Sequence, residues 1–174
     1  MPKSLSFAIS CLFCGTGMIL FVSTLGCGGK ELPAGFPKLY PCTITIVQEG
    51  EPLAGAVVRL HPQNPLDWMV DGKTDGRGVA VIHTHGIHAG APAGDFKVTV
   101  DKLESVVPPL PENLPTDEAA LSRLYNQQEA DTKEYRLVEP EYSKVDSTTL
   151  TITIDSKKTS ETFDVGKKYR ELAR

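Results

Sequence analysis

Segments in which apolar and polar residues alternate, separated by glycine-containing turns, recur between residues 42 and 165. Such alternation places the apolar side chains on one face of an extended chain, as in a half-buried β-strand. The segments cover residues 42–46, 56–61, 96–101, 150–155 and 163–165, and residues 79–84 read as a strand that is apolar on both faces. Turns such as Asp75-Gly76-Arg77-Gly78 separate them, without a βαβ rhythm. We therefore predict an all-β sandwich or barrel.

A proline-rich stretch, residues 104–141, interrupts this pattern and is interpreted as an insertion. It contains a candidate short helix that Thr116 can cap and whose first turn is acidic. One side of this helix carries a short apolar stripe, formed by Leu121, Leu124 and Tyr125. A connection of this length inside a compact domain is usually functional or disordered. We expect the stripe either to face a binding partner or to cover an open sheet edge.

The first 27 residues have the pattern of an export signal. Lys3 is their only charged residue, and a long apolar run follows it and ends in small residues before Cys27. The sequence Thr24-Leu25-Gly26-Cys27 resembles a bacterial lipobox, in which the cysteine becomes the lipidated N-terminus, although Thr24 departs from the leucine preferred there. We predict a signal peptide over residues 1–27 and lipid on Cys27. The alternatives are an uncleaved transmembrane anchor and plain secretion.

The segments that flank the predicted domain are assigned simpler roles. Prolines and glycines in residues 28–41 exclude a helix or an interior strand, so this stretch is interpreted as a tether between membrane and domain. Residues 166–174 are interpreted as a solvated C-terminal tail. The expected location is the cell envelope, with the chain lipid-anchored to a membrane on its periplasmic or outer face.

Charge and cysteine content argue against nucleic-acid binding and against thiol redox chemistry. The net charge of −4 offers no basic surface for nucleic acid. Cys11 and Cys14 lie inside the apolar run, and their Cys-x-x-Cys spacing lacks the βαβ context of a redox motif. If Cys27 carries lipid, Cys42 has no partner within the chain. We expect residues 42–165 to fold without a disulfide.

Three short sequence motifs resemble those of the carboxypeptidase regulatory-like domain, a transthyretin-like sandwich of small bacterial lipoproteins. They are residues 50–58 (Gly-Glu-Pro-Leu-Ala-Gly-Ala-Val-Val), residues 74–78 (Thr-Asp-Gly-Arg-Gly) and residues 90–100, which begin Gly-Ala-Pro-Ala-Gly-Asp-Phe. Pro140-Glu141-Tyr142-Ser143 is similar to the segment before the family's closing strands. The resemblance implies a transthyretin-like, Greek-key β-sandwich of about seven strands over residues 42–165. It also implies a domain that is typically non-catalytic.

Histidines form the one cluster that suggests metal chemistry. In His83-Thr84-His85-Gly86-Ile87-His88, strand alternation would turn His83 and His85 to the same side, and His88 could complete a site. The competing interpretation is an exposed strand end with its histidines in water. His61 or Asp71 could approach in space. The cluster is therefore a candidate metal site.

Motifs for catalysis are missing from the sequence. It contains no Gly-x-Ser-x-Gly elbow, Walker loop or His-Glu-x-x-His motif. Tyr169-Arg170-Glu171-Leu172 matches only the first two residues of the Tyr-Arg-Gly-Ser signature found in hydroxyisourate hydrolases on this fold. We therefore expect neither an enzyme nor a cofactor. Trp68 follows a proline-containing loop and is expected to pack over the sandwich end or to bind a partner or carbohydrate.

These observations predict a membrane-tethered, non-catalytic domain of a cell-envelope lipoprotein. Its expected partners are the membrane, through the N-terminal lipid, and an unknown envelope protein or carbohydrate. A periplasmic metal-binding protein that uses His83, His85 and His88 is the main alternative, and an enzyme on a transthyretin-like fold is a more distant one.

Overall fold

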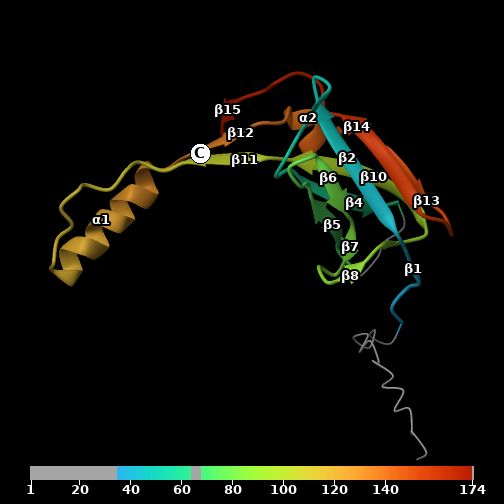
Figure 1. The fold of residues 1–174 in the computed structure, drawn as a ribbon, viewed down its shortest axis with the longest axis horizontal. Helices are drawn as coiled ribbons and strands as arrows, with labels where there is room; N and C mark the ends of the chain where they lie inside the picture. Colours follow the sequence, from blue (N-terminus) through green and yellow to red (C-terminus); the bar gives the residue numbers. More distant parts are fainter. Residues whose placement is uncertain (1–34, 64–67, 174) are drawn as a thin grey trace, which may run out of the picture. The chain divides into compact units, whose positions relative to one another are not determined.

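Two β-sheets supply the side chains of one hydrophobic core, so the chain is an all-β sandwich (Figure 1). The structure is a computed structural model and describes residues 35–63 and 68–173. In these ranges the two core sheets contain ten strands, seven of which have three or more residues. These seven are β2 (Cys42–Gln48), β4 (Val57–Pro62), β5 (Val70–Lys73), β6 (Val79–Val81), β10 (Gly94–Asp101), β13 (Thr151–Ile154) and β14 (Thr159–Asp164).

The larger sheet has the strand order β13–β10–β4–β5–β7–β8 and is antiparallel throughout. Its last two strands are short, with β7 at His83–Thr84 and β8 at His88–Ala89. Next to its edge strand β13 lies β10, which pairs with β13 on one side and with β4 on the other. Phe96, Val98 and Val100 of β10 point into the core and are at most 1% exposed. The predicted alternation along residues 96–101 is therefore confirmed.

The second sheet is organised around β2. β6 and β3 (Glu51–Pro52) pair with β2 in antiparallel fashion, whereas β14 pairs with it in parallel. Ile44 and Ile46 of β2 are fully buried. Cys42, at the start of β2, is buried as a free thiol, and burial raises the pKa of this thiol to about 11.

Residues 79–84 do not form the single strand that their apolar character predicts. β6 belongs to the second sheet and β7 to the larger sheet, and the chain changes sheets at the fully buried Ile82. Backbone hydrogen bonds on both sides secure this crossing: the Ile82 amide donates to the Cys42 carbonyl at 3.0 Å, and the Gly90 amide donates to the Ile82 carbonyl at 2.7 Å. Val81 is 49% exposed, so the segment is not buried on both faces.

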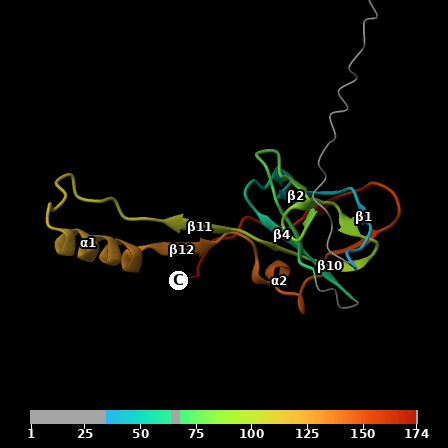
Figure 2. The same cartoon turned by 90° about the horizontal axis from the view of Figure 1, so that it is seen from below.

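Further elements lie outside the two core sheets. A two-stranded ladder joins β1 (Leu39–Tyr40) to β9 (Ala91–Pro92). A third sheet has the order β11–β12–β15, with β11 at Leu103–Val106, β12 at Lys133–Arg136 and β15 at Glu171–Leu172. The helices are α1 (Glu118–Asp131) and α2 (Pro140–Ser143). Figures 1 and 2 show α1 joined to the remainder of the fold through β11 and β12.

Three predicted boundaries are corrected by these elements. The predicted tether, residues 28–41, is too long, because β1 pairs with β9. The insertion ends near Arg136 rather than at residue 141, because Val138 is fully buried in the core and α2 lies against β10. The C-terminal segment is not a free tail, since β15 pairs with β12 and the Ala173 amide donates to the Glu134 carbonyl at 2.7 Å.

Candidate functional site

Four aromatic side chains meet at the end of the sandwich formed by β7 and β8. The Trp68 ring lies 4.9 Å from the Phe36 ring and 5.3 Å from the His85 ring, measured between centroids. The Phe36 ring also contacts His88 edge-on at 4.8 Å. Such tilted and edge-to-face contacts are favourable for aromatic rings. Trp68 therefore packs over the sandwich end, as one of its two interpretations predicts.

The turn between β7 and β8 explains why the histidines do not align as predicted. β7 ends at Thr84, and His85 has a left-handed backbone with φ of 55°. Strand alternation therefore stops before His85, and the expectation that His83 and His85 share one side is corrected. His83 Nδ1 lies 3.1 Å from the Val81 carbonyl oxygen, while His85 and His88 contact the aromatic rings.

No metal-ligand constellation is found among residues 35–63 and 68–173. Within them, no group of three His, Cys, Asp or Glu side chains is arranged to hold an ion. Asp71 pairs in register with His83. His61 lies on β4, where its Nε2 is 2.9 Å from Thr99 Oγ1. Burial, assisted by the charge of Arg59, lowers the pKa of His61 and favours its neutral form.

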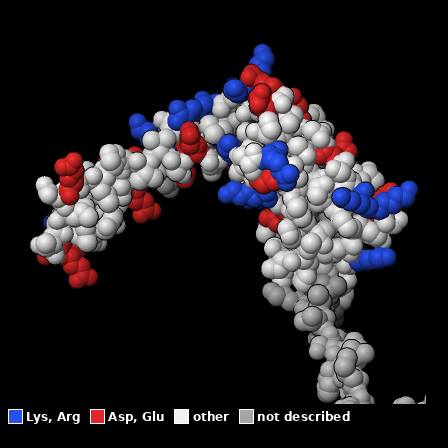
Figure 3. Space-filling view, in the orientation of Figure 1, with Lys and Arg blue, Asp and Glu red and all other residues white. Residues whose placement is uncertain are grey.

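Two exposed apolar side chains flank the aromatic rings. Met69 and Ile87 are each 58% exposed, and the His85 amide donates to the Met69 carbonyl at 2.7 Å, which joins the two loops that carry them. We call this group the aromatic cap; its members are Phe36, Trp68, Met69, His85, Ile87 and His88. Figure 3 shows mostly uncharged surface around β7 and β8 on the face in view. Sequence reasoning missed Phe36, which lies in the stretch interpreted as a tether.

The second candidate site is the arm, which we define as residues 103–136. Its helix α1 has 14 residues, none of them buried. Asp117, rather than Thr116, caps the helix, because its carboxylate accepts a hydrogen bond from the Ala120 amide at 2.8 Å. Of the predicted stripe, Leu121 and Leu124 are half-buried, and Tyr125 is 46% exposed.

A proline-rich segment runs beside the helix and accounts for the partial burial of the stripe. Pro108, Leu110 and Leu124 line a small shared crevice, and the Gln128 side-chain amide donates to the Pro108 carbonyl at 2.7 Å. The helix is therefore held by its own connecting loop, and its partial burial comes from within the arm. It does not cover the edge of a core sheet, which was the alternative prediction for this stripe.

The base of the arm is attached to β10 and the C-terminal segment. The Leu137 amide donates to the Lys102 carbonyl at 2.8 Å, and Arg136 Nε lies 3.5 Å from a carboxylate oxygen of Asp101. These two atoms, Arg136 Nε and Asp101 Oδ1, are buried and make no hydrogen bond, so the contact between them is electrostatic. Arg170 lies over the Tyr135 ring at 4.0 Å and pairs with Glu104 at 3.0 Å.

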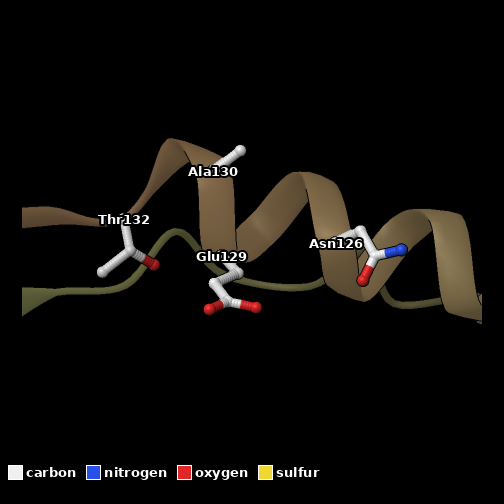
Figure 4. Close-up of a pocket in the computed structure, with 4 residues that line it drawn as sticks. All are labelled: Asn126, Glu129, Ala130 and Thr132. Carbon is white, nitrogen blue, oxygen red and sulfur yellow. The ribbon is translucent and has the colours of Figure 1, made fainter.

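Two hollows adjoin the arm. One, of about 420 Å³, lies at the C-terminal end of α1 and is lined by Asn126, Glu129, Ala130 and Thr132 (Figure 4). In Figure 4 the Asn126 and Glu129 side chains project to the same side of the helix and Ala130 to the other. The Thr132 hydroxyl donates to the Gln128 carbonyl at 2.8 Å, so it is occupied in capping the helix. These groups can offer hydrogen bonds to a partner.

The other hollow lies beside the C-terminal segment and has a volume of about 350 Å³. Leu53 and Leu137 give it an apolar floor, and Lys102, Lys168 and Arg170 give it positive charge. The buried Gln48 side-chain amide shapes this site by donating to the carbonyls of Leu137 at 3.0 Å and Lys167 at 2.9 Å. The site can accept an anionic group. It could not be found from the sequence, because it depends on the C-terminal segment returning to β12.

Comparison of the chain with protein-family models, with curated proteins and with solved structures finds no match in any of the three. Neither described helix is long and apolar enough to cross a bilayer. The predicted signal peptide, the lipidation site Cys27 and the tether up to residue 34 lie outside the described residues. The structure therefore establishes an all-β sandwich with an aromatic cap and a helical arm.

Proposed function

We propose that this chain is an exported, lipid-anchored, non-catalytic β-sandwich that presents its arm to a protein partner in the cell envelope. The single observation that supports this most is α1, a helix of 14 residues with no buried residue. An isolated helix of this length is marginal in water, and most helices in proteins are stabilised by packing an apolar face. A helix that packs only against its own connecting loop, and not against the core, is a suitable surface for recognition.

The partner is proposed from the chemistry of the arm surface. Residues 107–132 contain five carboxylate side chains and one basic residue, Arg123. Val107, Leu114 and Tyr125 add exposed apolar groups to this acidic segment. A partner that fits would combine a basic surface with a pocket for Tyr125, since tyrosines in such pockets often dominate binding energy. We also propose that the sandwich is a carboxypeptidase regulatory-like domain, which agrees with a non-catalytic role.

The arm is tested by removing residues 107–132 and leaving its two strands. Val106 and Lys133 are paired in the β11–β12 ladder, so an Asn-Gly turn can join them as a tight hairpin. We expect this variant to unfold within a few degrees of the wild-type temperature, because no residue of α1 belongs to the core. The cross-links that the full chain forms with its envelope partner should be absent in this variant.

A point variant and a matched control sharpen this test. Tyr125→Glu changes an exposed arm residue and should also abolish the cross-links, whereas Leu172→Glu changes a comparably exposed residue of β15 and should preserve them. Unchanged cross-links in both the deletion and Tyr125→Glu would refute the arm as the binding surface. Loss of folding in the deletion would show instead that the arm is structural.

The anchor is tested separately at Cys27. We expect Cys27→Ser to block both processing and the incorporation of labelled fatty acid, because the serine hydroxyl cannot replace the thiol that accepts the lipid. Intact mass and labelling are compared between the two proteins, with Cys42→Ser as the control that leaves labelling intact. Equal labelling of wild type and Cys27→Ser would refute lipidation, and an unlabelled full-length wild type would favour a transmembrane anchor.

A further inference from the structure

The aromatic cap combines three properties that suit contact with an apolar phase. It exposes the apolar side chains Met69 and Ile87, it carries the only tryptophan of the chain, and the surface around it is mostly uncharged in Figure 3. Tryptophan has an apolar ring and one polar N–H group, which suits a boundary between water and an apolar phase. The imidazoles of His85 and His88 add polar atoms beside the apolar ones.

The position of the cap along the chain limits what can contact it. Phe36 follows Cys27 by nine residues. A fully extended chain of nine residues spans about 30 Å, and any bend shortens this distance. If Cys27 is anchored in a bilayer, the cap is therefore held within a short distance of the lipid surface. Lys38 and Tyr40 follow Phe36 in the chain, and the Lys38 ammonium group lies 5.3 Å from the centre of the Tyr40 ring, so a cation and a further aromatic ring come soon after the first cap residue.

We infer that the aromatic cap is a membrane-contact surface, in which Trp68, Met69 and Ile87 enter the boundary between lipid headgroups and acyl chains. This inference rests on the proposed anchor and adds an orientation to it. Lipid on Cys27 holds the chain at one point only, and a second contact adds buried apolar area and fixes which side of the domain faces the bilayer. The cap supplies that second contact through apolar side chains, with Trp68, Tyr40 and Lys38 at the depth where aromatic and cationic residues gather.

Because Trp68 is the only tryptophan, its fluorescence reports on this surface alone. The full chain is reconstituted into vesicles of phosphatidylethanolamine and phosphatidylglycerol, with or without bromine atoms on the acyl chains. We expect the protein to float with the vesicles, the Trp68 emission to move to shorter wavelength, and brominated lipids to quench most of it.

Charged substitutions at the cap test whether the contact is specific. The double variant Met69→Glu, Ile87→Glu changes two residues that are each 58% exposed, so its thermal unfolding should match that of the wild type. It should still float through the anchor, but its Trp68 emission should escape quenching. Leu172→Glu, which adds a charge at a 56% exposed position on β15, should be quenched like the wild type.

The outcomes separate this inference from the proposed anchor. A wild-type protein that floats but whose Trp68 is not quenched overturns the membrane contact and leaves the anchor standing. Quenching that persists in the double variant overturns the assignment of the contact to Met69 and Ile87. A wild-type protein that does not float overturns the anchor and, with it, the bilayer as the surface that the cap meets.

Discussion

Replacing Phe96 by alanine should lower the free energy of unfolding by about 3–5 kcal/mol, the range for large-to-small changes at buried aromatic residues. Phe96 is 1% exposed and lies on β10, which is paired on both sides, opposite Pro62 of β4 and Ile152 of β13. Truncation removes its core contacts and leaves a cavity that these paired strands cannot easily close. Urea unfolding followed by circular dichroism measures the loss as a lower midpoint.

Lys97→Ala is the matched control for this variant. Lys97 is the next residue on β10 and points outward, where its ammonium group donates to the Val145 carbonyl at 3.0 Å on the exposed surface. Its loss should cost less than about 1 kcal/mol. Equal midpoints for the two variants would mean that β10 is shifted by one residue, since such a shift exchanges its two faces.

Gly78→Ala should lower the free energy of unfolding by at least about 2 kcal/mol, through backbone strain and a steric clash together. Gly78 has φ of 75°, and a Cβ atom built on it would lie 2.6 Å from the Ile46 carbonyl oxygen. That oxygen belongs to the central strand of the second sheet and accepts a hydrogen bond from the Leu53 amide at 2.9 Å. The clash therefore disturbs the hydrogen-bonded pairing of β3 and β6 with β2.

Gly76→Ala tests whether the effect belongs to this position rather than to the turn as a whole. Gly76 lies two residues earlier, and a Cβ atom there would meet no atom within 4 Å. The Gly76→Ala variant should change stability by less than about 1 kcal/mol in either direction. Thermal unfolding of both variants decides the matter, and a similar loss at both positions would contradict the proposed clash.

Local pattern was sufficient to predict the strands that carry the core. Val58 and Leu60 of β4 and Ile152 and Ile154 of β13 are buried as their alternation indicates, because a strand turns successive side chains to opposite faces whatever its neighbours are. The sandwich class was predictable for this reason.

Pairings that depend on distant residues were not predictable. Nothing in residues 79–84 indicates that the chain changes sheets at Ile82, since this depends on Cys42 and Gly90 as hydrogen-bond partners. The short strand β15 lacks an apolar alternation, and its two residues are exposed. Pairing with β12 brings it into the third sheet, and no local signal in the sequence reports that contact.

The candidate sites show the same division. Leu121, Leu124 and Tyr125 were found because they share one side of a helix, whereas the crevice that Leu124 forms with the proline-rich segment was missed. The histidines were misplaced because a left-handed residue, His85, breaks the strand that was expected to align them. The aromatic cap joins three separate segments of the chain, so its contacts follow from tertiary structure alone.

The parallel pairing of β14 with β2 sets the order in which this chain can complete its fold. The Thr43 hydroxyl donates to the Ser160 hydroxyl at 3.2 Å across a separation of 117 residues. The early strand β2 therefore cannot complete its pairing until the late strand β14 is present. Contacts between such distant residues slow folding, because a long loop must be closed before they form. For the export proposed above, this delay is an advantage, since the second sheet stays incomplete until Thr159–Asp164 can pair with β2.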